Sequence, residues 1–229
     1  TKLFREERER PILLWIDLHP GMYFGSTTQF KSVLAGRLAA LLGWAAVHSG
    51  DRVGGIVSAQ QGERIIPPTS RENGLLRLLA AMVELQPRES GSPYSGHSDA
   101  ALGRLAQLAH PGSLILMISD FQQISMASDA SLQRLSQHND LICGFLYDPL
   151  EKAPPPKGRY PVGDHQSSWT INTANPHLIQ RWQAAFQEHR QQLRQRCKRN
   201  NIHWMEIATS DPLPHSLQLG LQRQSHGGR

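Results

Sequence analysis

Residues 11–22, PILLWIDLHPGM, form the stretch that decides the fold. Within it, the apolar residues 12–16 predict a short strand that is buried on both faces. The strand ends at Asp17, and a loop with Pro20 and Gly21 follows. Open α/β sheets bind ligands at the carboxyl ends of their parallel strands, where Asp17 stands. The stretch therefore predicts a central strand with a candidate site at its end.

A second apolar run repeats this arrangement later in the chain. Residues 114–119, LILMIS, predict another buried strand, and Asp120 follows it directly. The carboxyl ends of neighbouring parallel strands lie at the same edge of a sheet. We therefore expect Asp17 and Asp120 to lie side by side at one rim.

The rest of the chain alternates between predicted helices and strands. Helices are predicted at residues 30–48, 70–86, 98–109, 128–137 and 175–199, and strands at 52–59, 64–66, 141–147 and 202–207. Residues 64–66 are expected to form an antiparallel edge strand, and residues 159–162 and 168–171 a small hairpin. This alternation predicts the α/β class: a doubly wound, mostly parallel sheet with helices on both faces and one antiparallel edge strand.

The chain length of 229 residues suits a single domain. We expect residues 11–151 to form its core and residues 152–212, with the hairpin, the long helix and the last strand, to complete the same domain. Residues 213–229 are expected to be a polar tail. Residues 1–10 are expected to be the end of a missing upstream segment, because the chain does not begin with Met.

Composition favours a cytoplasmic protein. No apolar run approaches the roughly 20 residues that span a bilayer, and the charged amino terminus lacks the apolar region of a signal peptide. Cys143 and Cys197 fit no metal or redox spacing and are expected to be buried thiols, which suits a reducing compartment. The net charge of +5 is compatible with acidic partners without requiring nucleic acid.

Three segments carry a family resemblance. FREERERPILLWIDL (4–18), AHPGSLILMISDF (109–121) and LYDPLE (146–151) resemble the bacterial family catalogued as domain of unknown function 58. The order of elements resembles a von Willebrand factor A domain more broadly. The resemblance covers essentially the whole chain. It implies a metal-ion-dependent adhesion site at the upper rim of a doubly wound sheet, and work alongside MoxR-type AAA+ ATPases in assembling or activating other complexes.

The adhesion-site pattern is only partly present. That pattern supplies D-x-S-x-S after the first strand, a Thr on a second loop and an Asp after the fourth strand. Asp17 and Asp120 match its acidic positions, but His19 and Gly21 replace the serines, and the Thr position falls near Ser98. Mg²⁺ prefers six oxygen ligands, whereas imidazole favours zinc and similar metals. We therefore expect a degenerate site of Asp17, His19, Ser98 and Asp120 that holds no cofactor, or weakly bound Mg²⁺.

Two alternatives stay open. Residues 96–100, GHSDA, resemble the G-x-S-x-G nucleophile elbow, so a hydrolase could use Ser98 or the cluster of Asp17, His19 and Asp120. The elbow requires a buried strand directly before it, and residues 86–95 are not one. Nucleic acid could bind basic residues of the long helix, but these lie among Gln and Glu residues without stacking aromatics. The basic residues are Arg181, Arg190, Arg194, Arg196, Lys198 and Arg199.

The sequence favours a non-enzymatic module that presents its rim to a protein partner, with an AAA+ ATPase as the partner that the resemblance implies. Neither a small-molecule substrate nor nucleic acid is expected, and the chain shows no membrane segment. Asp17, His19, Ser98 and Asp120 are the expected centre of the rim. The expected contact loop carries Met22, Tyr23, Ser26, Thr27 and Thr28.

Overall fold

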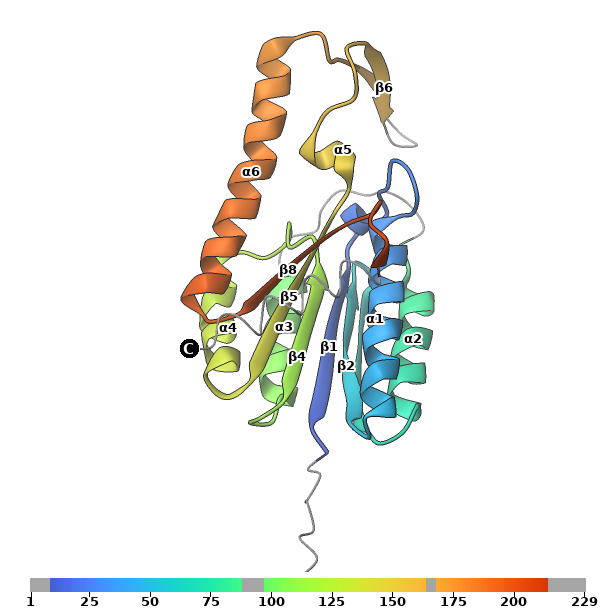
Figure 1. Ribbon diagram of the computed structural model, residues 1–229, viewed down its shortest axis with the longest axis vertical. Coiled ribbons are helices and arrows are strands. Elements are labelled where there is room, and N and C mark those ends of the chain that lie inside the picture. The colour runs from blue at the N-terminus through green and yellow to red at the C-terminus, as the bar shows by residue number, and fades with distance from the viewer. Residues whose placement is uncertain (1–8, 88–96, 164–167, 214–229) are drawn as a thin grey trace, which may run out of the picture.

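The computed structural model describes residues 9–87, 97–163 and 168–213. Most of the expected upstream segment and of the polar tail therefore lies outside the described residues. A six-stranded sheet with the order β3-β2-β1-β4-β5-β8 forms the centre of the molecule (Figure 1). Its strands are β1 (Pro11–Leu18), β2 (Arg52–Ala59), β3 (Gly62–Thr69), β4 (Leu114–Ser119), β5 (Asp140–Tyr147) and β8 (His203–Ala208). The pairing of β2 with β3 is antiparallel and the others are parallel, which confirms the predicted fold class.

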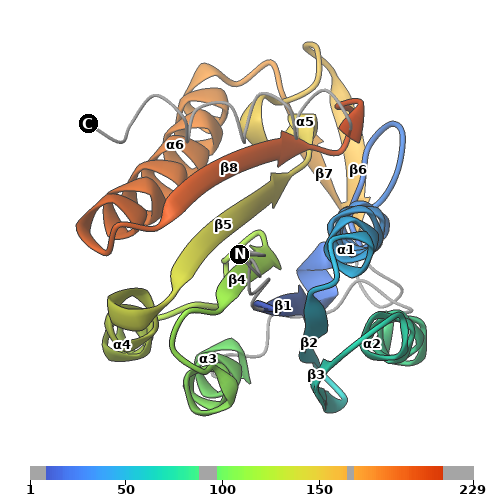
Figure 2. The same cartoon turned by 60° about the horizontal axis from the view of Figure 1, so that its bottom comes forward.

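Helices cover both faces of this sheet (Figure 2). Helices α1 (Lys31–His48) and α2 (Asn73–Leu85) pack on one face, and α3 (His97–Leu108), α4 (Asp129–His138) and α6 (Pro176–Arg199) supply the core of the other. Shorter elements are η1 (Pro20–Met22), η2 (Met126–Ser128) and α5 (Pro149–Lys152). The predicted hairpin forms from β6 (Arg159–Gly163) and β7 (Ser168–Asn172). Because β8 pairs with β5, the C-terminal part joins the central sheet.

Strand β1 is buried on both faces, as its apolar run predicts. Leu14 and Ile16 pack into the core beneath α1 and α2, whereas Leu13 and Trp15 pack into the core beneath α3, α4 and α6. The indole nitrogen of Trp15 donates a hydrogen bond to Ser58 Oγ at 3.1 Å, so this buried polar group is satisfied.

Strands β1 and β2 approach too closely for a side chain at Gly55. A Cβ atom there would lie 1.9 Å from the carbonyl oxygen of Leu14, and the φ angle of +152° also favours glycine. Gly55 is therefore required by the close packing of the two strands.

The candidate site lies where the winding of the sheet reverses. Strand β2 continues the sheet on one side of β1, and β4 continues it on the other. The chain leaves β1 towards α1 on one face, and it leaves β4 towards α4 on the opposite face. The two loops therefore diverge and leave space at the carboxyl ends of β1 and β4, the usual position of ligand sites in this fold class.

Some local predictions were wrong. Helix α2 begins at Asn73 and not at residue 70, and α3 begins at His97, one residue before the predicted start. Within the predicted helices, the apolar side chains of Val33, Leu41 and Val83 are 41%, 46% and 78% exposed. Their helices carry apolar residues well outside the stripe that meets the sheet, so the helical period alone overestimates the buried face.

Both cysteines are buried free thiols, as predicted. Within the described residues, no helix has the length and hydrophobicity needed to cross a membrane.

Candidate functional site

Asp17 lies on the side of the sheet that faces α3. The alternation of side chains along β1 turns Trp15 and Asp17 to the same face, and Ser119 of β4 lies there too. The carboxylate atom Oδ2 of Asp17 accepts hydrogen bonds from Ser119 Oγ at 2.9 Å and Ser98 Oγ at 3.1 Å. Its Oδ1 accepts from the backbone N–H of His19 at 3.3 Å. Asp17 is therefore buried with both oxygens engaged by uncharged donors.

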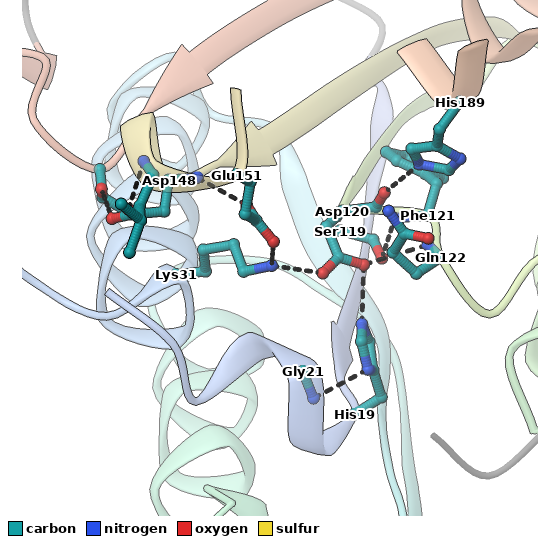
Figure 3. A network of polar contacts seen from close by, with 12 residues as sticks. His19, Gly21, Lys31, Ser119, Asp120, Phe121, Gln122, Asp148, Glu151 and His189 are labelled. Atoms are coloured by element: carbon teal, nitrogen blue, oxygen red, sulfur yellow. Dashed lines mark hydrogen bonds and ion pairs between the residues drawn. The ribbon is translucent and has the colours of Figure 1, made fainter. Parts of the chain in front are cut away.

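Asp120, one residue beyond β4, lies towards α1 and is held by two side chains (Figure 3). Its Oδ2 accepts from Lys31 Nζ at 2.6 Å, and its Oδ1 from His19 Nε2 at 2.7 Å. The Nδ1 atom of His19 accepts from the N–H of Gly21 at 3.1 Å. Because Nδ1 accepts a hydrogen bond, this arrangement corresponds to a neutral His19 ring with its proton on Nε2. Burial lowers the pKa of His19, but the hydrogen bond to Asp120 and the charges of Asp120 and Asp17 raise it above its ordinary value, so His19 gains a second proton more readily than a free imidazole.

Lys31 is the buried cation of the rim. It is the first residue of α1, its side chain is 1% exposed, and its Nζ also donates to Glu151 Oε1 at 2.7 Å. The amino end of a helix carries partial positive charge and disfavours a lysine, and the first turn of α1 contains no acidic residue. The carboxylates of Asp120 and Glu151 therefore provide the compensation that the helix itself lacks.

The charges of these groups shift one another's pKa values. Burial alone would raise the pKa of Asp120, but the Lys31 ammonium and the His19 hydrogen bond hold it well below its ordinary value. Burial lowers the pKa of Lys31, yet Asp120 and Glu151 raise it more, so Lys31 stays charged. In contrast, burial raises the pKa of Asp17 above its ordinary value, because no cation pairs with it directly.

A third strand-end carboxylate fixes the loop that borders the rim. Asp148 follows β5 and accepts from the backbone N–H of Ser26 at 2.9 Å, from Ser26 Oγ at 2.5 Å and from Thr209 Oγ1 at 2.5 Å. It also caps α5, and its own N–H donates to Glu151 Oε2 at 2.7 Å. Although burial raises the pKa of Asp148, these hydrogen bonds lower it below its ordinary value. The loop after η1 is thus tied to the same network as Lys31.

An open cavity of about 450 Å³ lies over this network. We call it the rim pocket. Phe24, which is 38% exposed, forms part of its wall, and the ring centroid of Phe24 lies 6.0 Å from Lys31 Nζ. The residues that line the rim pocket are His19, Pro20, Gly21, Tyr23, Phe24, Lys31, Asp120, Gln122, Gln123 and Glu151.

The structure brings the four expected centre residues into one cluster, in which Ser98 contacts Asp17, and His19 contacts both Asp17 and Asp120. In the expected contact loop, Ser26, Thr27 and Thr28 are exposed and Tyr23 is half-buried. The prediction that Met22 contacts a partner was wrong. Its side chain is fully buried in the hydrophobic core, so it supports the loop from beneath and is not available to a partner.

Sequence reasoning missed four residues of the cluster. Asp148 carried a usable signal, because the apolar run 141–147 ends on an acidic residue just as the runs before Asp17 and Asp120 do. Lys31 carried a weaker signal, a cation at a helix start. Glu151 carried a local signal, because it stands three residues after Asp148, the spacing of a capping box. Ser119 carried none, since its role depends on which strands become neighbours.

The residues present do not fit the divalent ion that the family resemblance implies. Both oxygens of Asp120 are engaged, and an ammonium lies 2.6 Å from one of them, where a second cation would be repelled. Asp17 already accepts three hydrogen bonds, and His19 offers Nδ1 to a backbone N–H. Among the described residues, no group of three or more His, Cys, Asp or Glu side chains is arranged to hold a metal ion.

The structure also locates the residues on which the hydrolase and nucleic-acid alternatives depend. The Ser98 hydroxyl is buried and donates to a carboxylate of Asp17, whereas a serine nucleophile needs an adjacent general base such as histidine. On α6, Arg190 pairs with Glu206 at 2.8 Å, and Arg196 pairs with Asp129. Two of the six basic residues of that helix therefore serve to attach it to the domain.

Comparisons with known proteins bear on the family. The family model described as protein of unknown function DUF58 matches residues 1–192. No curated protein matches the chain. The conserved hypothetical protein BatB from Bacteroides thetaiotaomicron has a similar structure, with 14% identity, a TM-score of 0.58, and coverage of 94% of this chain and 98% of that one.

Two further solved structures are similar. An aerotolerance-related membrane protein from Bacteroides fragilis shows 15% identity and a TM-score of 0.55, over 93% of this chain and 99% of that one. A von Willebrand factor type A protein from Catenulispora acidiphila shows 11% identity and a TM-score of 0.46, over 93% of this chain and 42% of that one. Identities this low concern the fold alone. The family itself is established by the family model, which spans most of the chain, and the protein belongs to the DUF58 family.

Proposed function

We propose that this protein is a non-enzymatic interaction module that binds a protein partner at the rim pocket. The observation that carries the proposal is the open cavity of about 450 Å³ at the carboxyl ends of β1 and β4. Its position is the usual ligand position of a doubly wound sheet. Its wall combines an exposed aromatic ring, Phe24, with the amides Gln122 and Gln123, a composition that suits a protein surface.

The border of the rim pocket is held in place before binding. Ser26 is tied to Asp148 through both its backbone N–H and its hydroxyl, and the rings of Tyr23 and Phe30 pack with centroids 4.5 Å apart. Ordering a loop in advance lowers the entropy cost of association. The proposal therefore expects the aromatic residues of this loop to carry much of the binding energy.

The family resemblance suggests a MoxR-type AAA+ ATPase as the partner, acting with this module in the assembly or activation of other complexes. Catalysis is not part of the proposal. The placement of Ser98 supports this, because its hydroxyl is buried and donates to an acidic group.

The test is direct binding of the purified chain to a MoxR-type ATPase from the same organism, measured by biolayer interferometry. Phe24→Ala should weaken binding by about tenfold or more, as expected for an aromatic anchor. Val83→Ala is the matched control, because Val83 is an exposed apolar residue on α2 that does not line the rim pocket. Equal affinities of wild type, Phe24→Ala and Val83→Ala would contradict the rim pocket as the binding site.

The same preparations separate the rival functions. A salt-dependent shift with DNA or RNA that survives Phe24→Ala would favour the basic helix. Turnover of ester or phosphate substrates that disappears in Ser98→Ala would favour a hydrolase. Either result would replace the proposal.

A further inference from the structure

We propose that the ammonium of Lys31 is the resident cation of the rim, in the place of the divalent ion that the adhesion-site pattern implies. The carboxylates of Asp120 and Glu151 are then compensated by a side chain of the same protein, without a metal ion. This inference stands on the geometry of the cluster and does not require the proposed function to be correct.

The first support is position. Lys31 Nζ lies between the carboxylates of Asp120 and Glu151, at 2.6 Å and 2.7 Å, and bridges the loop after β4 to α5 (Figure 3). In an adhesion site, a metal ion joins carboxylates from different loops in the same way. Here one ammonium makes the connection with hydrogen bonds that are short and charge-assisted.

The second support is burial. The Lys31 side chain is 1% exposed, although it begins a helix, where a solvated lysine would ordinarily extend into water. Lysine is rarely buried unless it is paired. The helix start adds an electrostatic cost, since α1 has no acidic residue in its first turn. A lysine placed here against local preference is explained by the carboxylates that it neutralises.

The third support is saturation of the acceptors. Asp120 uses Oδ2 for Lys31 and Oδ1 for His19 and the N–H of Gln122, and Glu151 uses one oxygen for Lys31 and the other for the N–H of Asp148. A divalent ion would have to displace these donors and then lie beside the ammonium. The structure therefore assigns the cation position to the side chain.

The first experiment measures Mn²⁺ binding to the wild-type chain by the electron paramagnetic resonance signal of free Mn²⁺. The inference expects no saturable site in the low millimolar range. A saturable site that disappears in Asp120→Asn would overturn it. This measurement uses the folded wild-type chain alone, so its result does not depend on partner binding.

The second experiment substitutes the cation. Lys31→Ala should lower the midpoint of thermal unfolding by about 10 °C, because two carboxylates lose their shared cation. Propylammonium, which has the methylenes and the ammonium that the substitution removes, should restore part of that loss. Lys31→Met should lose stability similarly but gain nothing from propylammonium, because the methionine fills the space.

Lys152→Ala controls for the loss of an exposed lysine near the same rim and should be close to wild type. A Lys31→Ala or Lys31→Met variant as stable as Lys152→Ala would overturn the inference, and so would a folded Lys31→Ala that propylammonium does not stabilise. If Lys31→Ala does not fold, the Mn²⁺ titration and Lys31→Met carry the test.

Discussion

Asp120→Asn tests the electrostatic account of the rim by removing the anion that Lys31 and His19 share. The side chain of Asp120 is 3% exposed and that of Lys31 is 1% exposed, so the substitution leaves a buried ammonium with one carboxylate, Glu151. Breaking a buried pair from one side costs about 3–5 kcal/mol. Because an asparagine oxygen can still accept from His19, we expect the lower end, about 3 kcal/mol of unfolding free energy.

Urea denaturation at neutral pH measures this loss, and Asp140→Asn is the matched control. Asp140 also pairs with a basic residue, Arg10, but its side chain is 69% exposed, and exposed pairs contribute about 0–1 kcal/mol. A loss in Asp120→Asn no larger than in Asp140→Asn would refute the reasoning.

The pH dependence gives the same prediction a second readout. The folded-state pKa of Asp120 lies below its unfolded value of about 3.9, so its stabilisation is fully present above that value and is lost as the pH falls towards the folded pKa. Because Asp120 also raises the pKa of His19, the stability difference between wild type and Asp120→Asn should reach its full size below the ordinary histidine value of about 6.5, stay constant down to about pH 4, and shrink below that. A difference that does not shrink below about pH 4 would contradict the assignment.

Asp17 has a raised folded-state pKa, so the folded state binds its proton more tightly than the unfolded state does. Wild type should therefore lose stability in urea denaturation as the pH rises above about 3.9, and Asp17→Asn should lack this slope. Parallel pH profiles of the two proteins would contradict the burial argument. Ser58→Ala leaves the indole N–H of Trp15 unpaired and should lower the free energy of unfolding, measured with urea, by about 1–3 kcal/mol. The same substitution made in a Trp15→Phe background should lower it by less. Equal losses in the two backgrounds would exclude the hydrogen bond as the cause. Gly55→Ala forces a Cβ against the carbonyl of Leu14 and should lower the free energy of unfolding by about 1–3 kcal/mol or more. A Gly55→Ala variant with an unchanged thermal midpoint would contradict the close approach of β1 and β2 described above.

The sequence was sufficient for the parts of the structure that depend on local pattern. The apolar run before Asp17 and the run before Asp120 are each short and uninterrupted, so both strands and their shared rim could be predicted. The antiparallel edge strand was predictable because prolines occur only at the edge of a sheet, although the strand does not end at Pro67 as predicted and continues to Thr69. The burial of Cys143 and Cys197 followed from residue type and setting.

The centre of the site was harder to predict because it depends on contacts that are distant in sequence. Lys31 meets Asp120 across 89 positions and Glu151 across 120, and neither separation has a periodic signal. Ser98 lies at the start of a predicted helix, but its hydroxyl donates to Asp17, which is 81 positions away in the sequence. The expected metal ligands therefore do form a cluster, but the sequence did not reveal the lysine that engages one of them.

The most direct test of the central claim is a crystal structure of the wild-type chain grown with millimolar Mn²⁺, with an anomalous difference map calculated at the rim. The account predicts Lys31 Nζ within hydrogen-bond distance of both Asp120 and Glu151, and no anomalous peak at either carboxylate. An anomalous peak bound to Asp17 or Asp120, with the Lys31 side chain turned away from it, would contradict the account.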